Sequence, residues 1–114
     1  MKIKVAADFT RTPGHRSPDD GLFSGELFLK DILSPVFQDC YNLNDLLFVD
    51  LDGTAGYATS FLEASFGGLA RIYPIDEVLK RIRIICVSEP YLVEEVDAYI
   101  KEARNKKANE HAHA

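Results

Sequence analysis

The sequence predicts an α/β fold: one small domain with a parallel or mixed sheet packed by about three to four helices. Short apolar strand patterns alternate with longer helical patterns along the 114 residues. The segments between the strands are long enough to hold helices, which favours parallel pairing. The hydrophobic fraction of 46% suits a folded core. We therefore expect a single domain over residues 1–108 and a flexible C-terminal tail over residues 109–114.

The N-terminal part of the chain predicts a strand, a loop and a helix. Polar and apolar residues alternate over residues 2–7, which is the pattern of a half-buried strand. Prolines and a glycine make residues 10–20 a loop. Ser24 is a suitable N-cap for the helix that follows, because its hydroxyl can accept from a free N–H of the first turn. Pro35 is expected to end or kink this helix.

The middle of the chain predicts a second strand and a second helix. Residues 46–49 (Leu-Leu-Phe-Val) form a continuous apolar run, typical of a strand covered on both faces. After a turn, Ser60 and Glu63 have the spacing of a capping box, in which two side chains bond backbone N–H groups at the helix start. Apolar residues at helical spacing follow, until residues 73–74 (Tyr-Pro) break the helix.

The last third of the chain predicts a third strand and a final helix. Residues 76–80 suit a short helical turn, and residues 82–87 form another buried apolar strand. Ser88 and Pro90 stand where a helix opens, as the cap and the first-turn proline. The core-facing stripe of this helix consists of Leu92, Val96, Tyr99 and Ala103.

Composition argues against two classes of function. The formal net charge is −5, and a sequence-independent nucleic-acid binder would instead need many Lys and Arg to neutralise phosphates. The N-terminus lacks the apolar core of a signal peptide, and no apolar run is long enough to cross a bilayer. We expect a cytoplasmic protein that binds neither nucleic acid nor membrane.

The two cysteines predict no metal site. Cys40 and Cys86 are not in a CxxC motif and have no Cys/His ligand spacing, so we expect no metal and no cofactor. Cys86 lies within a predicted strand and is expected to be a small core residue. A reduced setting fits this pattern, although the sequence leaves a disulfide open.

Carboxylates follow two of the predicted strands. Asp8 comes after the first strand, and Asp50 and Asp52 come after the second. The carboxyl ends of parallel strands border the ligand crevice in α/β proteins, and two carboxylates on one face could hold Mg²⁺. The alternative is that these residues form turns by accepting hydrogen bonds from loop amides.

Residues 48–54 (Phe-Val-Asp-Leu-Asp-Gly-Thr) resemble the nucleophile motif of haloacid-dehalogenase-type phosphatases. The resemblance implies that Asp50 attacks phosphorus and that Asp52 acts as acid and base. In that family the motif begins the first core strand, and later strands supply a second acidic site. Here a strand and a helix precede the motif, and only one helix follows Ser88. A small magnesium-dependent phosphohydrolase is therefore the alternative function.

A second resemblance covers nearly the whole chain. Its motifs are Pro-Gly-His-Arg at residues 13–16, Gly-Leu-Phe-Ser-Gly-Glu at residues 21–26, and the stretch over residues 50–69. Together they resemble the STAS-like domain family of unknown function, named after sulfate transporter and anti-sigma factor antagonist domains. The resemblance implies a small sheet, usually mixed, with helices on one side. It modifies the two-sided packing that residues 46–49 predict.

The resemblance also implies a switch at the start of the second helix. In bacterial anti-sigma factor antagonists, a partner kinase phosphorylates a Ser or Thr at this turn and so switches partner binding. Matching that turn to this chain places Thr59 at the switch position and Ser60 beside it, whereas Ala58 and Phe61 depart from the antagonist motif. A phosphate suits a helix N-terminus. The alternative is that Thr59 and Ser60 only cap the helix.

The leading interpretation is a non-enzymatic module that binds a protein partner, which the resemblance suggests is a kinase-like ATPase of the anti-sigma type. A homodimer stays open. The candidate partner-binding residues lie in the same helix, beside its start or in the loop at residues 10–20: Tyr57, Phe61, Glu63, Gly67, Gly68, His15 and Arg16. Two glycines inside a helix require close packing against the sheet or close approach of a partner backbone. His15 and Arg16 either bind an anion or are only exposed loop residues.

Overall fold

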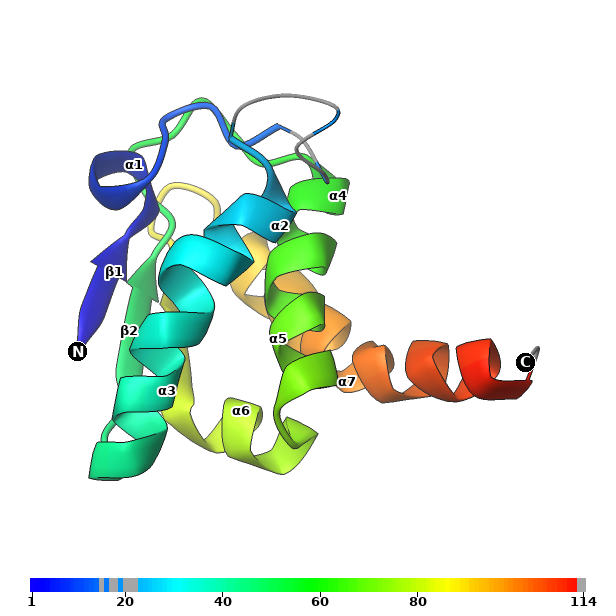
Figure 1. Ribbon diagram of the computed structural model, residues 1–114. Helices are drawn as coiled ribbons and strands as arrows, with labels where there is room; N and C mark the ends of the chain where they lie inside the picture. Colours follow the sequence, from blue (N-terminus) through cyan, green and yellow to red (C-terminus); the bar gives the residue numbers. More distant parts are fainter. Residues whose placement is uncertain (15, 17–18, 20–22, 113–114) are drawn as a thin grey trace.

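The three strands form one parallel sheet (Figure 1). The computed structural model describes residues 1–14, 16, 19 and 23–112, the last nine of these through their backbone only. The strands are β1 (Lys2–Lys4), β2 (Leu47–Asp50) and β3 (Ile82–Ile85). Their spatial order β1-β2-β3 equals their order in the chain, so each connection is a crossover that contains helices. The parallel form of the predicted sheet is confirmed.

Strand β1 is shorter than its alternating sequence predicts. It ends at Lys4, and Val5–Asp8 form a single helical turn, α1. Lys4 pairs with Asp50, the last residue of β2, so the ladder has no partner for a longer β1. The carboxylate of Asp8 instead accepts the N–H of Lys4 at 2.8 Å and fixes the turn.

One continuous helix precedes β2, in three segments: α2 (Gly25–Phe28), the π-helical η1 (Leu29–Leu33) and α3 (Ser34–Leu43). The predicted cap is confirmed, because Ser24 Oγ accepts the N–H of Leu27 at 3.1 Å. Pro35 does not end this helix. It lies in the first turn of α3, directly after the π-helical segment, where the wider turn accommodates a residue that has no N–H.

A second continuous helix follows β2, again with a π-helical centre: α4 (Thr59–Leu62), η2 (Glu63–Gly67) and α5 (Gly68–Ile72). The predicted capping box is wrong. The helix begins at Thr59 with Ala58 as its N-cap, so Ser60 is already inside the first turn. Glu63 forms ion pairs with two arginines instead.

Two more helices complete the chain. The predicted helical turn before β3 is confirmed as α6 (Ile75–Arg81). The last helix, α7 (Tyr91–Ala112), begins just after Pro90 and is helical through residues 109–112, part of the segment predicted as a tail. No helix within the described residues combines the length and apolar composition needed to span a membrane.

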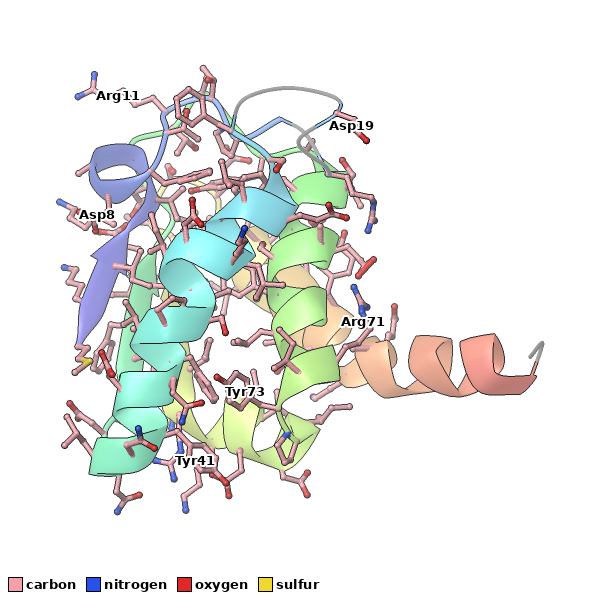
Figure 2. The ribbon with its side chains drawn as sticks, in the orientation of Figure 1. Asp8, Arg11, Asp19, Tyr41, Arg71 and Tyr73 are labelled. Carbon is pink, nitrogen blue, oxygen red and sulfur yellow. The ribbon has the colours of Figure 1, made fainter. Side chains whose placement is uncertain are left out.

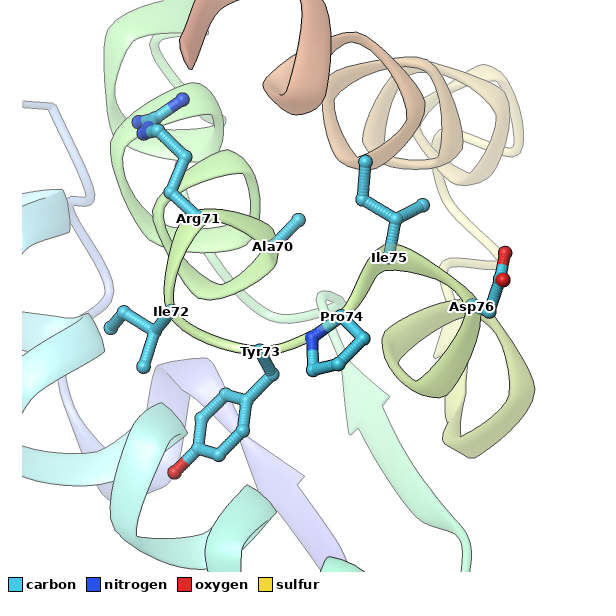
Figure 3. Close-up of a pocket in the computed structure, with 7 residues that line it drawn as sticks. All are labelled: Ala70, Arg71, Ile72, Tyr73, Pro74, Ile75 and Asp76. Atoms are coloured by element: carbon cyan, nitrogen blue, oxygen red, sulfur yellow. The ribbon is translucent and has the colours of Figure 1, made fainter. Parts of the chain in front are cut away.

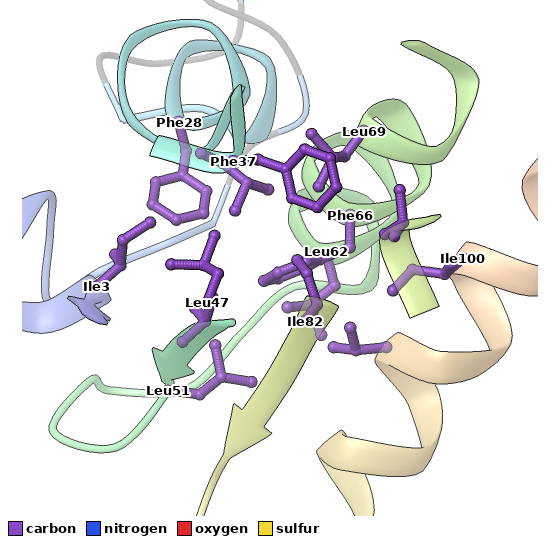
Figure 4. Close-up of a cluster of buried hydrophobic side chains, with 14 of the residues drawn as sticks. Ile3, Phe28, Phe37, Leu47, Leu51, Leu62, Phe66, Leu69, Ile82 and Ile100 are labelled. Atoms are coloured by element: carbon purple, nitrogen blue, oxygen red, sulfur yellow. The ribbon is translucent and has the colours of Figure 1, made fainter. Parts of the chain in front are cut away.

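The helices cover one face of the sheet. The helices α2–α3 and α4–α5 lie side by side over this face, and α7 runs beside β3 and behind α5 (Figure 1). Figure 4 shows Phe28, Phe37 and Phe66 of the two helices directed toward the inner side chains of the strands. The expectation of one-sided packing is confirmed.

The other face of the sheet is open, which corrects the two-sided strand predicted over residues 46–49. Leu47 and Val49 are fully buried, whereas Phe48 between them is 39% exposed. The side chains of strand β2 therefore alternate between buried and exposed, although its sequence does not alternate between apolar and polar residues.

Candidate functional site

The loops after β2 and β3 meet at the carboxyl end of the sheet, and Asp52 joins them. Its carboxylate accepts the N–H groups of Val87 and Ser88, each at 2.9 Å, and the hydroxyl of Ser88 at 2.7 Å. The Cys86 thiol donates a longer contact at 3.6 Å. These bonds, led by the one from the Ser88 hydroxyl, lower the pKa of Asp52 to about 2. Asp52 thus links the loop that follows β2 to the loop that follows β3.

Asp50 shapes the same turn from the other side. Its Oδ1 accepts the N–H of Asp52 at 2.9 Å, the two-residue bond of an Asx turn. Both carboxylates therefore form turns, as one of the two sequence interpretations expects. A carboxyl group with a pKa near 2 does not suit the acid role that the phosphatase resemblance gives Asp52. Across the described part of the chain, no three His, Cys, Asp or Glu side chains gather to hold a metal ion.

Two loops hold the start of helix α4 in place. The Tyr57 hydroxyl donates to the carbonyl of Leu51 at 2.8 Å, and burial of this half-buried side chain raises its pKa above the ordinary value. The loop between α1 and α2 supplies two carbonyls: Arg11 accepts from Ala55 at 2.8 Å and Pro13 accepts from Ala58 at 3.2 Å. Tyr57 is therefore a positioning residue for the entrance of α4.

The two predicted phosphorylation candidates differ in exposure. Thr59, the first residue of α4, is exposed, and Ser60 is half-buried. The N-cap residue Ala58 offers no side-chain oxygen to the first turn of the helix. Thr59 therefore carries an accessible hydroxyl at the start of a helix. The N-cap residue of this helix has no side chain that could accept hydrogen bonds from the N–H groups of the first turn.

Glu63 lies one turn further along the same helix face as Thr59. Its Oε1 is 3.1 Å from Nη1 of Arg16, and its Oε2 is 3.0 Å from Nη2 of Arg71 (Arg71 is labelled in Figure 2). The Glu63 side chain is only 14% exposed, so water screens these pairs weakly. The ion pairs tie the loop that contains Arg16 to helix α4–α5. His15, the other candidate in this loop, lies outside the described residues.

Three predicted partner contacts are in the core and are corrected here. Phe61 is fully buried, with its ring stacked on Phe28 at 5.7 Å between centroids. Gly67 and Gly68 are buried as well. A Cβ atom on Gly68 would lie 2.6 Å from Cδ2 of Leu29, so the glycine permits close approach of the two long helices, and not of helix and sheet as expected.

A Cβ atom on Gly67 would lie 2.5 Å from Oε2 of Glu63 on its own helix. Because Gly67 has no Cβ atom, the Glu63 carboxylate can occupy this space and pair with Arg71. Sequence reasoning missed Gly25, where a Cβ atom would lie 2.5 Å from the carbonyl oxygen of Phe61. The signal in the sequence was a glycine directly after the N-cap Ser24, at a helical position where alanine has the higher helix propensity.

A surface pocket lies at the C-terminal end of helix α4–α5, and Arg71, the ion-pair partner of Glu63, is among its lining residues. It has a volume of about 430 Å³ and is lined by residues 70–76, at the turn from α5 into α6 (Figure 3). Tyr73 and Tyr41, with rings 6.2 Å apart, mark this end of the molecule in Figure 2, opposite the end where α4 begins. None of the predicted site residues lines this pocket.

A short parallel sheet with helices on one face, and a candidate site made of loops and a helix start, define the class of protein: a small α/β domain. The chain belongs to the family described as STAS-like domain of unknown function (DUF4325), whose family model matches residues 24–92. The match runs from the N-cap of α2 into α7 and includes the whole helix that begins at Thr59. Searches of curated proteins and of solved structures found no match.

Proposed function

We propose that this protein is a non-enzymatic regulatory module that binds a protein partner at the start of helix α4, with phosphorylation of Thr59 as its control. Membership of a STAS-like family supports an interaction role in general. The observation that carries the proposal is the exposed Thr59 hydroxyl at a helix start whose N-cap residue, Ala58, has no capping side chain.

Charge near Thr59 supports a phosphate at this position. A phosphothreonine carries about −1.5 to −2 charges and is stabilised by the N–H groups and dipole of a helix N-terminus. Glu63 lies one helical turn after Thr59 and pairs with Arg16 at 3.1 Å. A phosphate on Thr59 competes with Glu63 for this guanidinium. Transfer of Arg16 to the phosphate would loosen the loop from α4 and change the surface that a partner meets.

Thr59 is the better of the two phosphorylation candidates. A kinase must surround the accepting hydroxyl, and Thr59 is exposed whereas Ser60 is half-buried. The surface that we assign to the partner consists of Thr59, Arg16 and the edge of Glu63. The partner itself, a kinase-like ATPase of the anti-sigma type, is proposed from the family resemblance.

The cellular setting belongs to the same proposal. Both cysteines are free thiols and buried, which suits a reducing compartment such as the cytoplasm. Burial also raises the pKa of the Cys40 and Cys86 thiols, which keeps both in the unreactive protonated form.

The test is a native pull-down of the full chain, with mass spectrometry of the bound proteins and of the peptide that contains Thr59. We expect a protein partner and a phosphate on Thr59. Thr59→Glu should weaken the complex about tenfold or more, as a buried like charge or a lost contact at an interface does, and Thr59→Ala should retain it. Asn42→Glu, which adds the same charge on the exposed surface of α3, is the matched control.

The phosphorylation switch and the non-enzymatic role can be contradicted separately. A partner that binds Thr59→Glu as tightly as the unmodified chain would overturn the switch. Hydrolysis of a phosphoester by the purified chain, abolished by Asp50→Asn, would overturn the non-enzymatic role.

A further inference from the structure

The open face of the sheet carries an ordered pattern of cations around one aromatic ring. Lys2, Phe48 and Arg83 stand in one row across β1, β2 and β3, and the next outward row is Lys4, Asp50 and Ile85. Side chains in register on neighbouring strands point to the same face. We call these six residues the outer face.

Exposure agrees with this register. Lys2, Lys4 and Arg83 are exposed, and Phe48 presents 39% of its surface on the central strand. The inner neighbour Leu47 lies fully buried beneath the helices (Figure 4), and Val49 is fully buried as well. A large aromatic side chain at the centre of an open sheet face is a feature of interaction surfaces, where aromatic residues are enriched.

The charge of this face is opposite to that of the molecule. Three cations accompany one carboxylate, Asp50, in a chain whose formal net charge is −5. The guanidinium of Arg83 is also oriented, since Nη1 donates to the carbonyls of Ile82 at 2.8 Å and Leu79 at 3.2 Å. A cation that is already held in place loses less entropy when a carboxylate binds it.

An apolar groove borders the outer face along β3. Its volume is about 280 Å³, and it lies between β3 and α7. Apolar side chains dominate the lining, among them Leu79, Val93 and Val96, with Arg83 and Asp97 as its charged members. Arg83 thus belongs to both the groove and the outer face, and the two form one surface.

We propose that the outer face is a docking surface for an acidic segment of another protein. Carboxylates of this segment pair with Lys2, Lys4 and Arg83, and its apolar side chains pack on Phe48 and in the groove beside β3. Charge complementarity identifies this occupant. The surface is separate from the start of α4, and the proposal does not rest on the function of Thr59.

Other occupants fit the charges less well. A symmetric dimer through this face would bring Lys2, Lys4 and Arg83 of one copy against the same cations of the second copy. A nucleic acid would meet a single aromatic ring in a molecule of net charge −5, which repels a polyanion at long range.

The test is an NMR titration of the full chain with a synthetic peptide in which Glu residues flank Leu and Phe. We expect shifts of the amide signals of β1, β2 and β3, and a dissociation constant that rises with salt. Lys4→Glu should weaken binding about fivefold, since it replaces one exposed attraction with a repulsion. Lys30→Glu, the same change on the exposed surface of the helix that precedes β2, should leave binding within about twofold.

Phe48→Ser separates packing from charge. It should weaken peptide binding severalfold, while Leu43→Ser, at a residue 67% exposed on α3, should not. Circular dichroism checks that each variant is folded. The proposal is overturned if the peptide does not bind, if Lys4→Glu and Lys30→Glu behave alike, or if a uridine-rich RNA or anionic lipid vesicles bind the same residues more tightly. Self-association of the chain that Lys4→Glu abolishes would also overturn it.

Discussion

At the scale of single residues, Asp52 shows how a carboxylate in a catalytic-looking motif becomes structural. It follows a strand, as a catalytic aspartate would, but three donors from residues 87 and 88 already occupy its oxygens. The same bonds that stabilise its charge hold the two loops together. A carboxylate so occupied contributes its hydrogen bonds to the fold at the carboxyl end of the sheet.

We predict that Asp52→Asn destabilises the protein and that the effect depends on pH. The pKa of Asp52 is lowered from 3.8 to about 2, so the stabilisation by its charge is fully present above about pH 4. It is lost as the pH falls through 2, because protonation removes the charge in the folded state. Urea unfolding at pH 7 and at steps down to pH 2 should show a lower midpoint for the variant that converges with the wild type in acid.

Asp31→Asn is the control for this prediction, since Asp31 is exposed on the helix that precedes β2. Its unfolding midpoint should match the wild type at every pH. A difference between Asp52→Asn and the wild type that stays constant down to pH 2 would contradict a role for the Asp52 charge.

At the scale of elements, two long helices with π-helical centres pack closely through glycines. Gly25 faces the backbone of the second helix, with the carbonyl oxygen of Phe61 at 2.5 Å from a Cβ position. Gly68 faces the tip of the Leu29 side chain at 2.6 Å. A side-chain tip can rotate away, whereas a backbone carbonyl moves only with its whole helix.

We therefore predict that Gly25→Ala destabilises the protein more than Gly68→Ala. Overpacking costs about 1–3 kcal/mol, and we expect Gly25→Ala at the upper end of this range. For Gly68→Ala, the gain in helix propensity of about 1 kcal/mol offsets part of the cost. The measurement is the free energy of unfolding in urea.

Gly14→Ala is the matched control, because its nearest neighbour is the Thr12 carbonyl oxygen at 3.9 Å. It should change stability by less than about 0.5 kcal/mol. If Gly68→Ala proves more costly than Gly25→Ala, then Leu29 is fixed in place and the backbone of α4 is the part that yields.

At the scale of the whole molecule, the sheet divides the chain into a core side and an open side. All helices of the described chain except the single turn α1 pack on the core side or beside β3. The apolar run in β2 therefore holds side chains with two different roles. Leu47 belongs to the fold, and Phe48 is available for binding.

We predict that Leu47→Ala and Phe48→Ala differ strongly in stability. Leu47 is fully buried, so its truncation should cost about 2–5 kcal/mol through lost burial and a residual cavity. Phe48 is 39% exposed and open to solvent on its face, so its truncation should cost well below about 2 kcal/mol. Thermal unfolding of both variants checks this, and similar costs would mean that both faces of β2 are buried.

The sequence predicted much of this fold because its signals are local. The strand patterns over residues 2–7, 46–49 and 82–87, the Ser24 cap and the helix before β3 each depend on neighbours within a few residues. Periodicity and capping act over that range, so they can be read without the fold. The α/β class and its parallel sheet then follow from the order of the elements.

The rest depended on residues far apart in the chain. Thr59 was found from a family resemblance, but its exposure at a helix start, one turn before the residue that pairs with Arg16, required the structure. Ser60 and Glu63 match a capping box locally, yet pairing with Arg16 and Arg71 offers Glu63 stronger, charge-assisted partners.

The sequence by itself determined the elements and their order, while the tertiary structure decided which residues are available for function. Phe61 and Gly68 are buried because the two long helices pack together, and Phe48 is exposed because no helix covers the second face of the sheet. Asp52 is a clamp because β3 ends beside β2, although 36 residues separate Asp52 from Ser88. Burial and pairing across such distances are set by packing, which no local pattern contains.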